Sequence, residues 1–143
     1  MPHPKDVGDH ATLAVALALH ATGRRVLLPF GENVRYDLAI DGGGAIERVQ
    51  CKSAVLHDGV VWFRTTSAYG HHRSPRQLRR GYVGEIDYFG VFCPATAGVY
   101  LVPVGDVPSR SEAALRIAPP RNGQRRRIRF GAPYLVTEVR LGT

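Results

Sequence analysis

The chain has 143 residues, of which 44% are hydrophobic and 22% are charged. This length suits one domain built around one core, and we expect a single domain over residues 1–143. The modest charged fraction argues against a disordered chain. The formal net charge of +7 favours an anionic partner such as nucleic acid, and a basic surface that only maintains solubility is the alternative.

The first predicted element is a helix over residues 6–22. Ala and Leu are strong helix formers. Leu13, Leu17 and Ala21 recur at i, i+4 and i+8, which predicts an apolar stripe that Ala14, Val15 and Ala18 widen. Gly23 suits the position just after a helix end. Because the apolar run is too short to span a bilayer, we expect no membrane partner and a cytoplasmic location.

Strand-like segments follow the helix. Residues 36–41 alternate apolar and polar side chains, three glycines at 42–44 supply a turn, and residues 45–54 alternate again. The order of elements predicts an α/β or α+β fold with a central mixed β-sheet flanked by helices. Further strands are expected over 25–29, 60–66, 85–93 and 99–104, and a short helix over 112–116 with Ser109 or Ser111 as its N-cap.

The cysteines exclude two kinds of site. Cys51 and Cys93 are the only two, and neither belongs to a C-x-x-C pair, so a disulfide framework or a zinc site is not expected. Cys51 lies between Gln50 and Lys52 in the sequence, so alternation points it to the other face of its strand and predicts a core position. A reduced, cytosolic protein is the simplest interpretation.

The predicted hairpin carries polar groups that can act together. Asp37 precedes the glycine turn, and Gln50 and Lys52 follow it on one face of the second strand. Carboxylate and amide oxygens are hard ligands that suit Mg²⁺, and an ammonium group can stabilise charge on a phosphate. Such a set can hydrolyse a phosphodiester with the help of a metal ion. A solvent-exposed face of the same composition is the alternative.

These residues carry a resemblance to a known family. The segments "YDLAID" and "VQCKSA" resemble the active-site hairpin of the PD-(D/E)XK nuclease superfamily. The match is to the Q-x-K branch, in which glutamine replaces the second acid and which includes a group I intron-encoded homing endonuclease. The helix end and the later strand pair also fit, so the resemblance covers about residues 6–117.

The resemblance implies a restriction-endonuclease-like core and a Mg²⁺-dependent DNA endonuclease, with Mn²⁺ as an alternative ion. It assigns Asp37 as the metal-binding acid, Gln50 as the second ligand and Lys52 as the catalytic lysine. Thr12 occupies the position at which the family tends to have an acid on the first helix. Asp9 then serves as a further metal ligand, or it only favours the helix N-terminus through the dipole.

Two arginine clusters are candidate contacts to double-stranded DNA. Dense cationic blocks are typical of surfaces that bind phosphate backbones, although scattered arginines also occur on ordinary solvated surfaces. The first cluster contains Arg73, Arg76, Arg79 and Arg80, and the second contains Arg125, Arg126 and Arg127.

One site cuts one strand, so a double-strand break requires a dimer or a larger assembly. The intron enzyme that the chain resembles is a tetramer, and a homo-oligomer is therefore expected. Two alternatives to this endonuclease stay open. One is a DNA-binding protein that keeps the nuclease fold without cleavage, and the other is a structure-selective nuclease similar to a Holliday junction resolvase.

Overall fold

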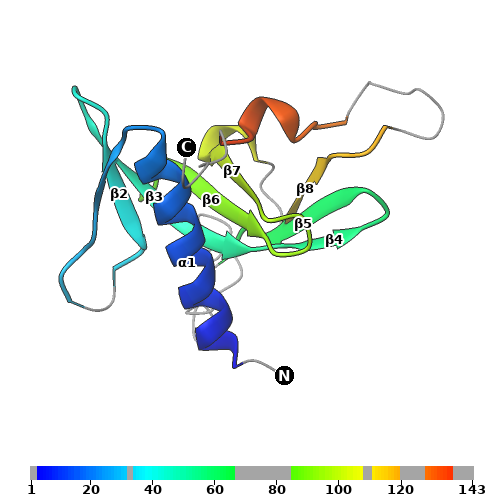
Figure 1. Cartoon of the computed structure of the whole chain (residues 1–143), viewed down its shortest axis with the longest axis horizontal. Coiled ribbons are helices and arrows are strands. Elements are labelled where there is room, and N and C mark those ends of the chain that lie inside the picture. Colours follow the sequence, from blue (N-terminus) through cyan, green and yellow to red (C-terminus); the bar gives the residue numbers. More distant parts are fainter. Residues whose placement is uncertain (1–2, 32–33, 67–84, 108–110, 120–127, 137–143) are drawn as a thin grey trace.

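The computed structural model describes residues 3–31, 34–66, 85–107, 111–119 and 128–136. Within these ranges it has one α-helix, α1 (Pro4–Ala21), and two β-sheets (Figure 1). Sheet A comprises, in spatial order, β1 (Arg25–Leu27), β2 (Leu38–Asp41), β3 (Ile46–Ser53), β6 (Tyr88–Cys93) and β7 (Gly98–Pro103). Sheet B comprises β4 (Val55–His57), β5 (Val60–Arg64) and β8 (Glu112–Arg116). Short 3₁₀ turns are at Val104–Asp106 and Ala132–Tyr134.

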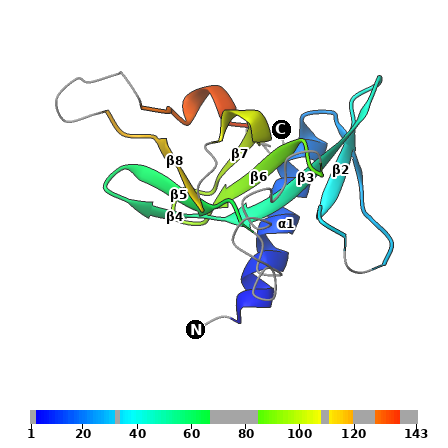
Figure 2. The same ribbon diagram turned by 180° about the vertical axis from the view of Figure 1, so that it is seen from behind.

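Sheet A is mixed, as the sequence predicts. Its neighbouring strands are antiparallel except for β3 and β6, which run parallel. Within the described residues one α-helix, α1, flanks this sheet. One face of sheet A packs against α1, whereas the other face shares a hydrophobic core with sheet B. The view from behind shows sheet B extending to one side of sheet A (Figure 2).

The core between the two sheets is built from alternate strand residues. Phe63 of β5 meets Phe89 of β6 with their ring centroids 5.8 Å apart. Val61 and Leu115 of sheet B are fully buried in the same cluster. Because both faces of sheet A are covered, β6 is buried over almost its whole length.

The predicted helix is confirmed, and its buried face includes Val15 and Ala18 of the expected stripe but not Leu13 or Leu17. The helix ends at Ala21 with Thr22 as its C-cap, and Gly23 follows with a φ of +90°, which glycine adopts without strain. Leu13 and Leu17 are 70% and 50% exposed, and the side chains that face sheet A are Ala11, Val15, Ala18 and Leu19. No helix in the described part of the chain is long and apolar enough to cross a membrane.

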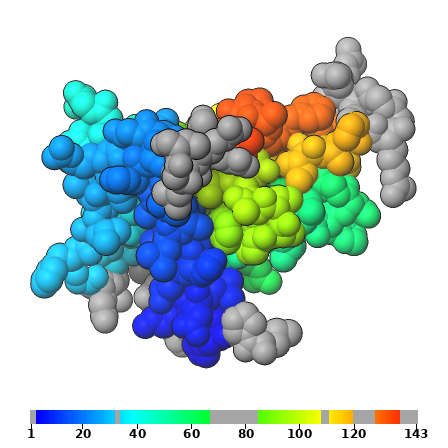
Figure 3. Space-filling view, in the orientation of Figure 1, coloured from blue at the N-terminus to red at the C-terminus, as the bar shows by residue number. Residues whose placement is uncertain are grey.

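Gly90 on β6 explains which helix face is buried. A Cβ at Gly90 would lie 2.7 Å from Cγ1 of Val15 and 2.9 Å from Cγ1 of Val49. The absence of a side chain there lets Val15 approach the sheet closely. α1 therefore packs with Val15 toward sheet A. The helix lies across the front of the molecule in Figure 3 (blue).

The short helix expected over residues 112–116 is instead the strand β8. It pairs antiparallel with β5 along its whole length, and the carbonyl of Ser111 accepts a hydrogen bond from the Thr65 N–H at 2.9 Å. Ala113 and Leu115 are buried in the inter-sheet core. Burial of alternate residues and pairing with β5 override the helix propensity of these residues. Ser109 lies outside the described residues.

Candidate active site

The open end of the β2–β3 hairpin holds Asp37 beside Gln50. The regular pairing ends at Leu38 and Val49, and Asp37 comes one residue before it. The Asp37 N–H donates to the Val49 carbonyl at 2.9 Å, and the Asp37 Oδ2 accepts from the Cys51 N–H at 2.8 Å. These two hydrogen bonds reach the residues on either side of Gln50.

The carboxylate of Asp37 is partly removed from water. Desolvation raises the pKa of Asp37 above its ordinary value, while the hydrogen bond from Cys51 and the charge of Lys52 act to lower it. The charge of Asp9 on α1 raises it further. The hydrogen bond and the nearby charge offset only part of the lost hydration of this carboxylate. A cation bound to the carboxylate would therefore stabilise its negative charge.

Lys52 lies on the same strand, two residues beyond Gln50, so the two side chains share a face. Its Nζ donates a hydrogen bond to the Thr66 carbonyl at 2.9 Å. Burial lowers the pKa of Lys52 to about 8, with Asp37 acting in the opposite direction. Lys52 and Asp37 are therefore close enough for each charge to affect the other.

Two arginines near Lys52 were not singled out by sequence reasoning. The charges of Arg35 and Arg64 both lower the pKa of Lys52, so they lie within electrostatic reach of it. Arg35 also forms an ion pair with Glu85, with Nε and Oε2 2.8 Å apart. A sequence signal did exist for Arg64, because it occupies an outward position in the alternating pattern of β5.

α1 brings two further polar residues near the hairpin. The Thr12 hydroxyl donates to the Gly8 carbonyl at 3.1 Å and lies near Cys51, which is buried as predicted. Asp9 is exposed, and its effect on the pKa of Asp37 shows that its charge reaches the site.

The oxygen atoms of the site suit a hard cation that takes few of its ligands from the protein. In the described part of the chain, no group of three or more His, Cys, Asp or Glu side chains could hold a metal ion. Asp37 and Gln50 offer one carboxylate and one amide oxygen. Mg²⁺ is commonly bound through one or two carboxylates together with phosphates of the substrate, so these two residues fit it.

The predicted arginine contacts cannot be placed relative to this site. Both clusters lie outside the described residues, within 67–84 and 120–127. The members are Arg73, Arg76, Arg79, Arg80, Arg125, Arg126 and Arg127.

Two of the solved structures that this chain matches are nucleases by name. The bacterial homing endonuclease I-Ssp6803I is 24% identical, with a TM-score of 0.68 over 94% of this chain and 88% of that one. The Holliday junction resolvase Hjc of Archaeoglobus fulgidus is 14% identical, with a TM-score of 0.46 over 76% of this chain and 83% of that one. At such low sequence identity, a structural match shows a shared fold and not a shared function. No curated protein matches the sequence.

The sequence also matches a family model over most of its length. The model of the PD-(D/E)XK endonuclease covers residues 2–137, which is nearly the whole chain. It includes α1, both sheets and the hairpin that carries Asp37, Gln50 and Lys52. The chain therefore belongs to the PD-(D/E)XK endonuclease family.

Proposed function

We propose that this endonuclease is a DNA phosphodiester hydrolase that depends on a divalent metal ion, with Mg²⁺ as the natural ion and Mn²⁺ as a substitute. The observation that carries the proposal is the pair of hydrogen bonds that hold Asp37 beside Gln50, with Lys52 in electrostatic reach. The fold that it shares with the homing endonuclease I-Ssp6803I supports a similar use on DNA.

Each residue has a separate role in this proposal. Asp37 and Gln50 hold the cation with a carboxylate and an amide oxygen, and Asp9 adds negative charge from α1. When bound, the metal polarises the phosphate and promotes attack by water. Lys52 stabilises the negative charge that develops on the phosphate oxygens. Its hydrogen bond to the Thr66 carbonyl fixes the ammonium group in position.

Double-stranded DNA is the proposed partner, since a net charge of +7 favours a polyanion. The two arginine clusters are the proposed contacts to its backbone. A cytoplasmic location agrees with Cys51 and Cys93 being buried free thiols.

A homo-oligomer, either a dimer or a tetramer, is the proposed working form. Two sites are needed to cut both strands of a duplex. The exposure of Leu13 and Leu17 on α1 supports association between copies, because burial of large apolar side chains in an interface lowers the free energy. Sedimentation of the free protein measures the number of chains.

A DNA-binding protein without cleavage is the second candidate. It is favoured by the neutral side chain of Gln50 and by Thr12 at a position where the family tends to have an acid. Neutral ligands hold a divalent ion less tightly than charged ones.

Supercoiled plasmid distinguishes the two. We expect nicked or linear DNA in Mg²⁺ or Mn²⁺, none in excess EDTA, and none with Lys52→Ala, while Lys5→Ala on the exposed start of α1 cuts normally. Plasmid binding without scission in either ion would establish the second candidate. Full cleavage by Lys52→Ala would refute the role given to Lys52.

A further inference from the structure

A pocket with a volume of about 520 Å³ opens beside Lys52. Apart from Lys52 and Thr66, its lining residues have no role in the hydrolysis proposed above. Lys52 and Ser53, at the end of β3, line one part of it. Val55, Trp62, Arg64 and Glu112, all from sheet B, line another. The pocket therefore continues directly from the candidate active site onto the outer face of sheet B.

The end of β5 is attached to the site. Thr66 comes two residues after Arg64, and its carbonyl accepts the hydrogen bond from the Lys52 Nζ at 2.9 Å. Thr65, between them, is buried and its N–H donates to the Ser111 carbonyl. These contacts fix the position of the outer face of sheet B relative to Lys52.

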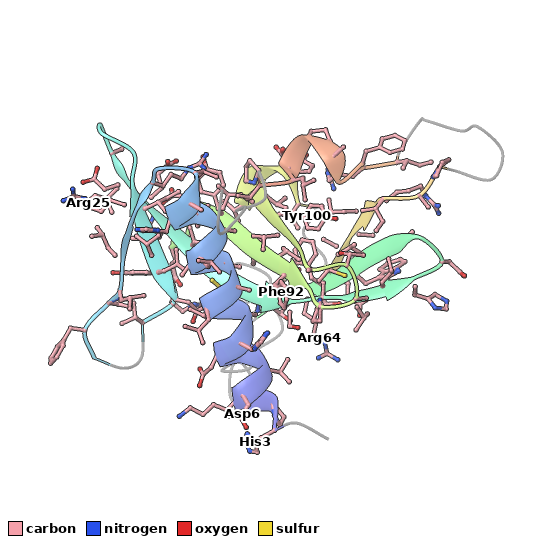
Figure 4. All side chains as sticks on the ribbon, viewed as in Figure 1. His3, Asp6, Arg25, Arg64, Phe92 and Tyr100 are labelled. Atoms are coloured by element: carbon pink, nitrogen blue, oxygen red, sulfur yellow. The ribbon has the colours of Figure 1, made fainter. Side chains whose placement is uncertain are left out.

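The outer face combines an aromatic surface with a cation. Trp62 pairs directly with Val55, and the two side chains are 39% and 66% exposed. Arg64 is one strand period from Trp62, so it lies on the same face, and it projects outward (Figure 4). Glu112 is the cross-strand neighbour of Arg64, a position from which it can orient the guanidinium group.

This chemistry suits one nucleotide better than a protein partner. A tryptophan face can stack on any base, and an arginine beside it can pair with the adjoining phosphate. The apolar lining of the pocket, which includes Trp62, is bordered by the cations Arg64 and Lys52 and by one anion, Glu112. A second copy of a chain with net charge +7 would bring further positive charge to this border.

We propose that the pocket receives an unpaired nucleobase of the DNA strand, stacked on Trp62, next to the phosphate that is cut. This inference rests on the proposed function, which places that phosphate at Lys52. It assigns Trp62 as the stacking surface and Arg64 as a contact to the neighbouring phosphate. The substrate is then double-stranded DNA that is opened at the cut site, so that one base there is unpaired.

Trp62 is the single tryptophan of the chain, so its fluorescence reports on the pocket directly. The full chain is titrated with a short oligodeoxythymidylate in EDTA, which prevents hydrolysis. We expect the emission of Trp62 to be quenched in step with binding, which is followed separately by the anisotropy of a labelled oligonucleotide. A fully paired duplex of the same length should quench less at equal occupancy.

Substitutions of Trp62 test the stacking through the affinity for the oligonucleotide. Trp62→Ala should weaken oligonucleotide binding about tenfold, as expected for the loss of one stacked base, and Trp62→Phe should retain most of the affinity. Phe30→Ala is the matched control, because Phe30 is a fully exposed aromatic residue that does not line the pocket. Circular dichroism checks the fold of each variant, and the titration of the wild-type chain does not depend on any of them.

Several results would overturn the inference. They are unchanged Trp62 emission at saturating oligonucleotide, no binding of the oligonucleotide, or Trp62 emission that changes on dilution without DNA, which would mean that a second copy covers the pocket. Plasmid cleavage with unchanged emission would refute this inference alone. Quenching without cleavage in Mg²⁺ or Mn²⁺ would instead refute the proposed hydrolysis.

Discussion

The β2–β3 hairpin has an aspartate near each end, and the two carboxylates have different surroundings. Asp41, at the turn, is exposed, and its Oδ1 accepts a hydrogen bond from the Gly43 N–H at 3.1 Å. Asp37, at the open end, is partly buried, bonded to the Cys51 N–H, and has a raised pKa because of desolvation. Asp41 has the usual local role of an aspartate in a turn, whereas the surroundings of Asp37 destabilise its charge.

The difference comes from what packs around each end. The open end lies where α1, β3 and the end of β5 meet, since α1 packs against Val49 and Cys51 of β3 and Lys52 donates a hydrogen bond to Thr66. The turn end projects away from the rest of the molecule (Figure 1), and Ile46 there is 61% exposed. A costly buried charge is maintained only at the end where other elements converge, which is typical of a functional site.

The largest expected effect is on cleavage. Asp37→Asn should reduce DNA cleavage by at least about 100-fold, because the charged ligand is lost while the hydrogen bond to Cys51 can still form. Asp41→Asn makes the same chemical change at the turn end and should leave the rate within about twofold. Initial rates of plasmid nicking measure both. Equal losses in the two variants would remove the functional distinction between the ends.

The next largest effect is on stability. Leu38 is fully buried at the open end, so Leu38→Ala should lower the free energy of unfolding by about 2–5 kcal/mol. Ile46 is largely exposed at the turn end, and Ile46→Ala should change it by no more than about 0.5 kcal/mol. Urea unfolding measures both values. Similar values for the two variants would show that the turn end is packed as well as the open end.

A smaller effect is expected on the need for metal. Gln50→Glu adds a carboxylate beside Asp37 and should lower the Mg²⁺ concentration for half-maximal cleavage about tenfold, because more ligand charge holds the ion more tightly. Glu47→Gln removes a carboxylate from the turn half of the same strand and should leave that concentration unchanged. The Mg²⁺ dependence of the nicking rate measures both. An unchanged requirement in Gln50→Glu would exclude Gln50 from the metal site.

The hairpin was predictable because its signals are local. Alternation of polar and apolar residues around a glycine turn predicts two strands, and it correctly separates buried Val49 and Cys51 from Gln50 and Lys52. The strand pairing at the open end could also be predicted, because the paired residues Leu38 and Val49 are only eleven positions apart in the sequence.

Features that depend on distant residues were not predictable in this way. Nearly every position in the middle of α1 is Ala, Val or Leu, so the pattern alone cannot decide which face is buried. The choice depends on Gly90, far along the chain, where a missing side chain accommodates Val15. The same holds for Arg64, which reaches Lys52 only because sheet B packs beside sheet A.

The smallest expected effect follows from the raised pKa of Asp37. The folded state binds this proton more tightly than the unfolded state does, so the carboxylate opposes folding at neutral pH. This cost disappears as pH falls through the raised pKa toward the ordinary value of 3.8. Without metal, Asp37→Asn should therefore be more stable than the wild type at neutral pH, and this advantage should shrink as the pH falls toward 3.8 and be absent below it.

Thermal unfolding of both proteins across this pH range, in EDTA, measures the difference. Adding Mg²⁺ at neutral pH should raise the melting temperature of the wild type and not that of Asp37→Asn, because a cation that binds the folded state offsets the cost of the buried charge. A variant that is less stable than the wild type at neutral pH would mean that Asp37 is a structural residue. The two ends of the hairpin would then differ in packing alone.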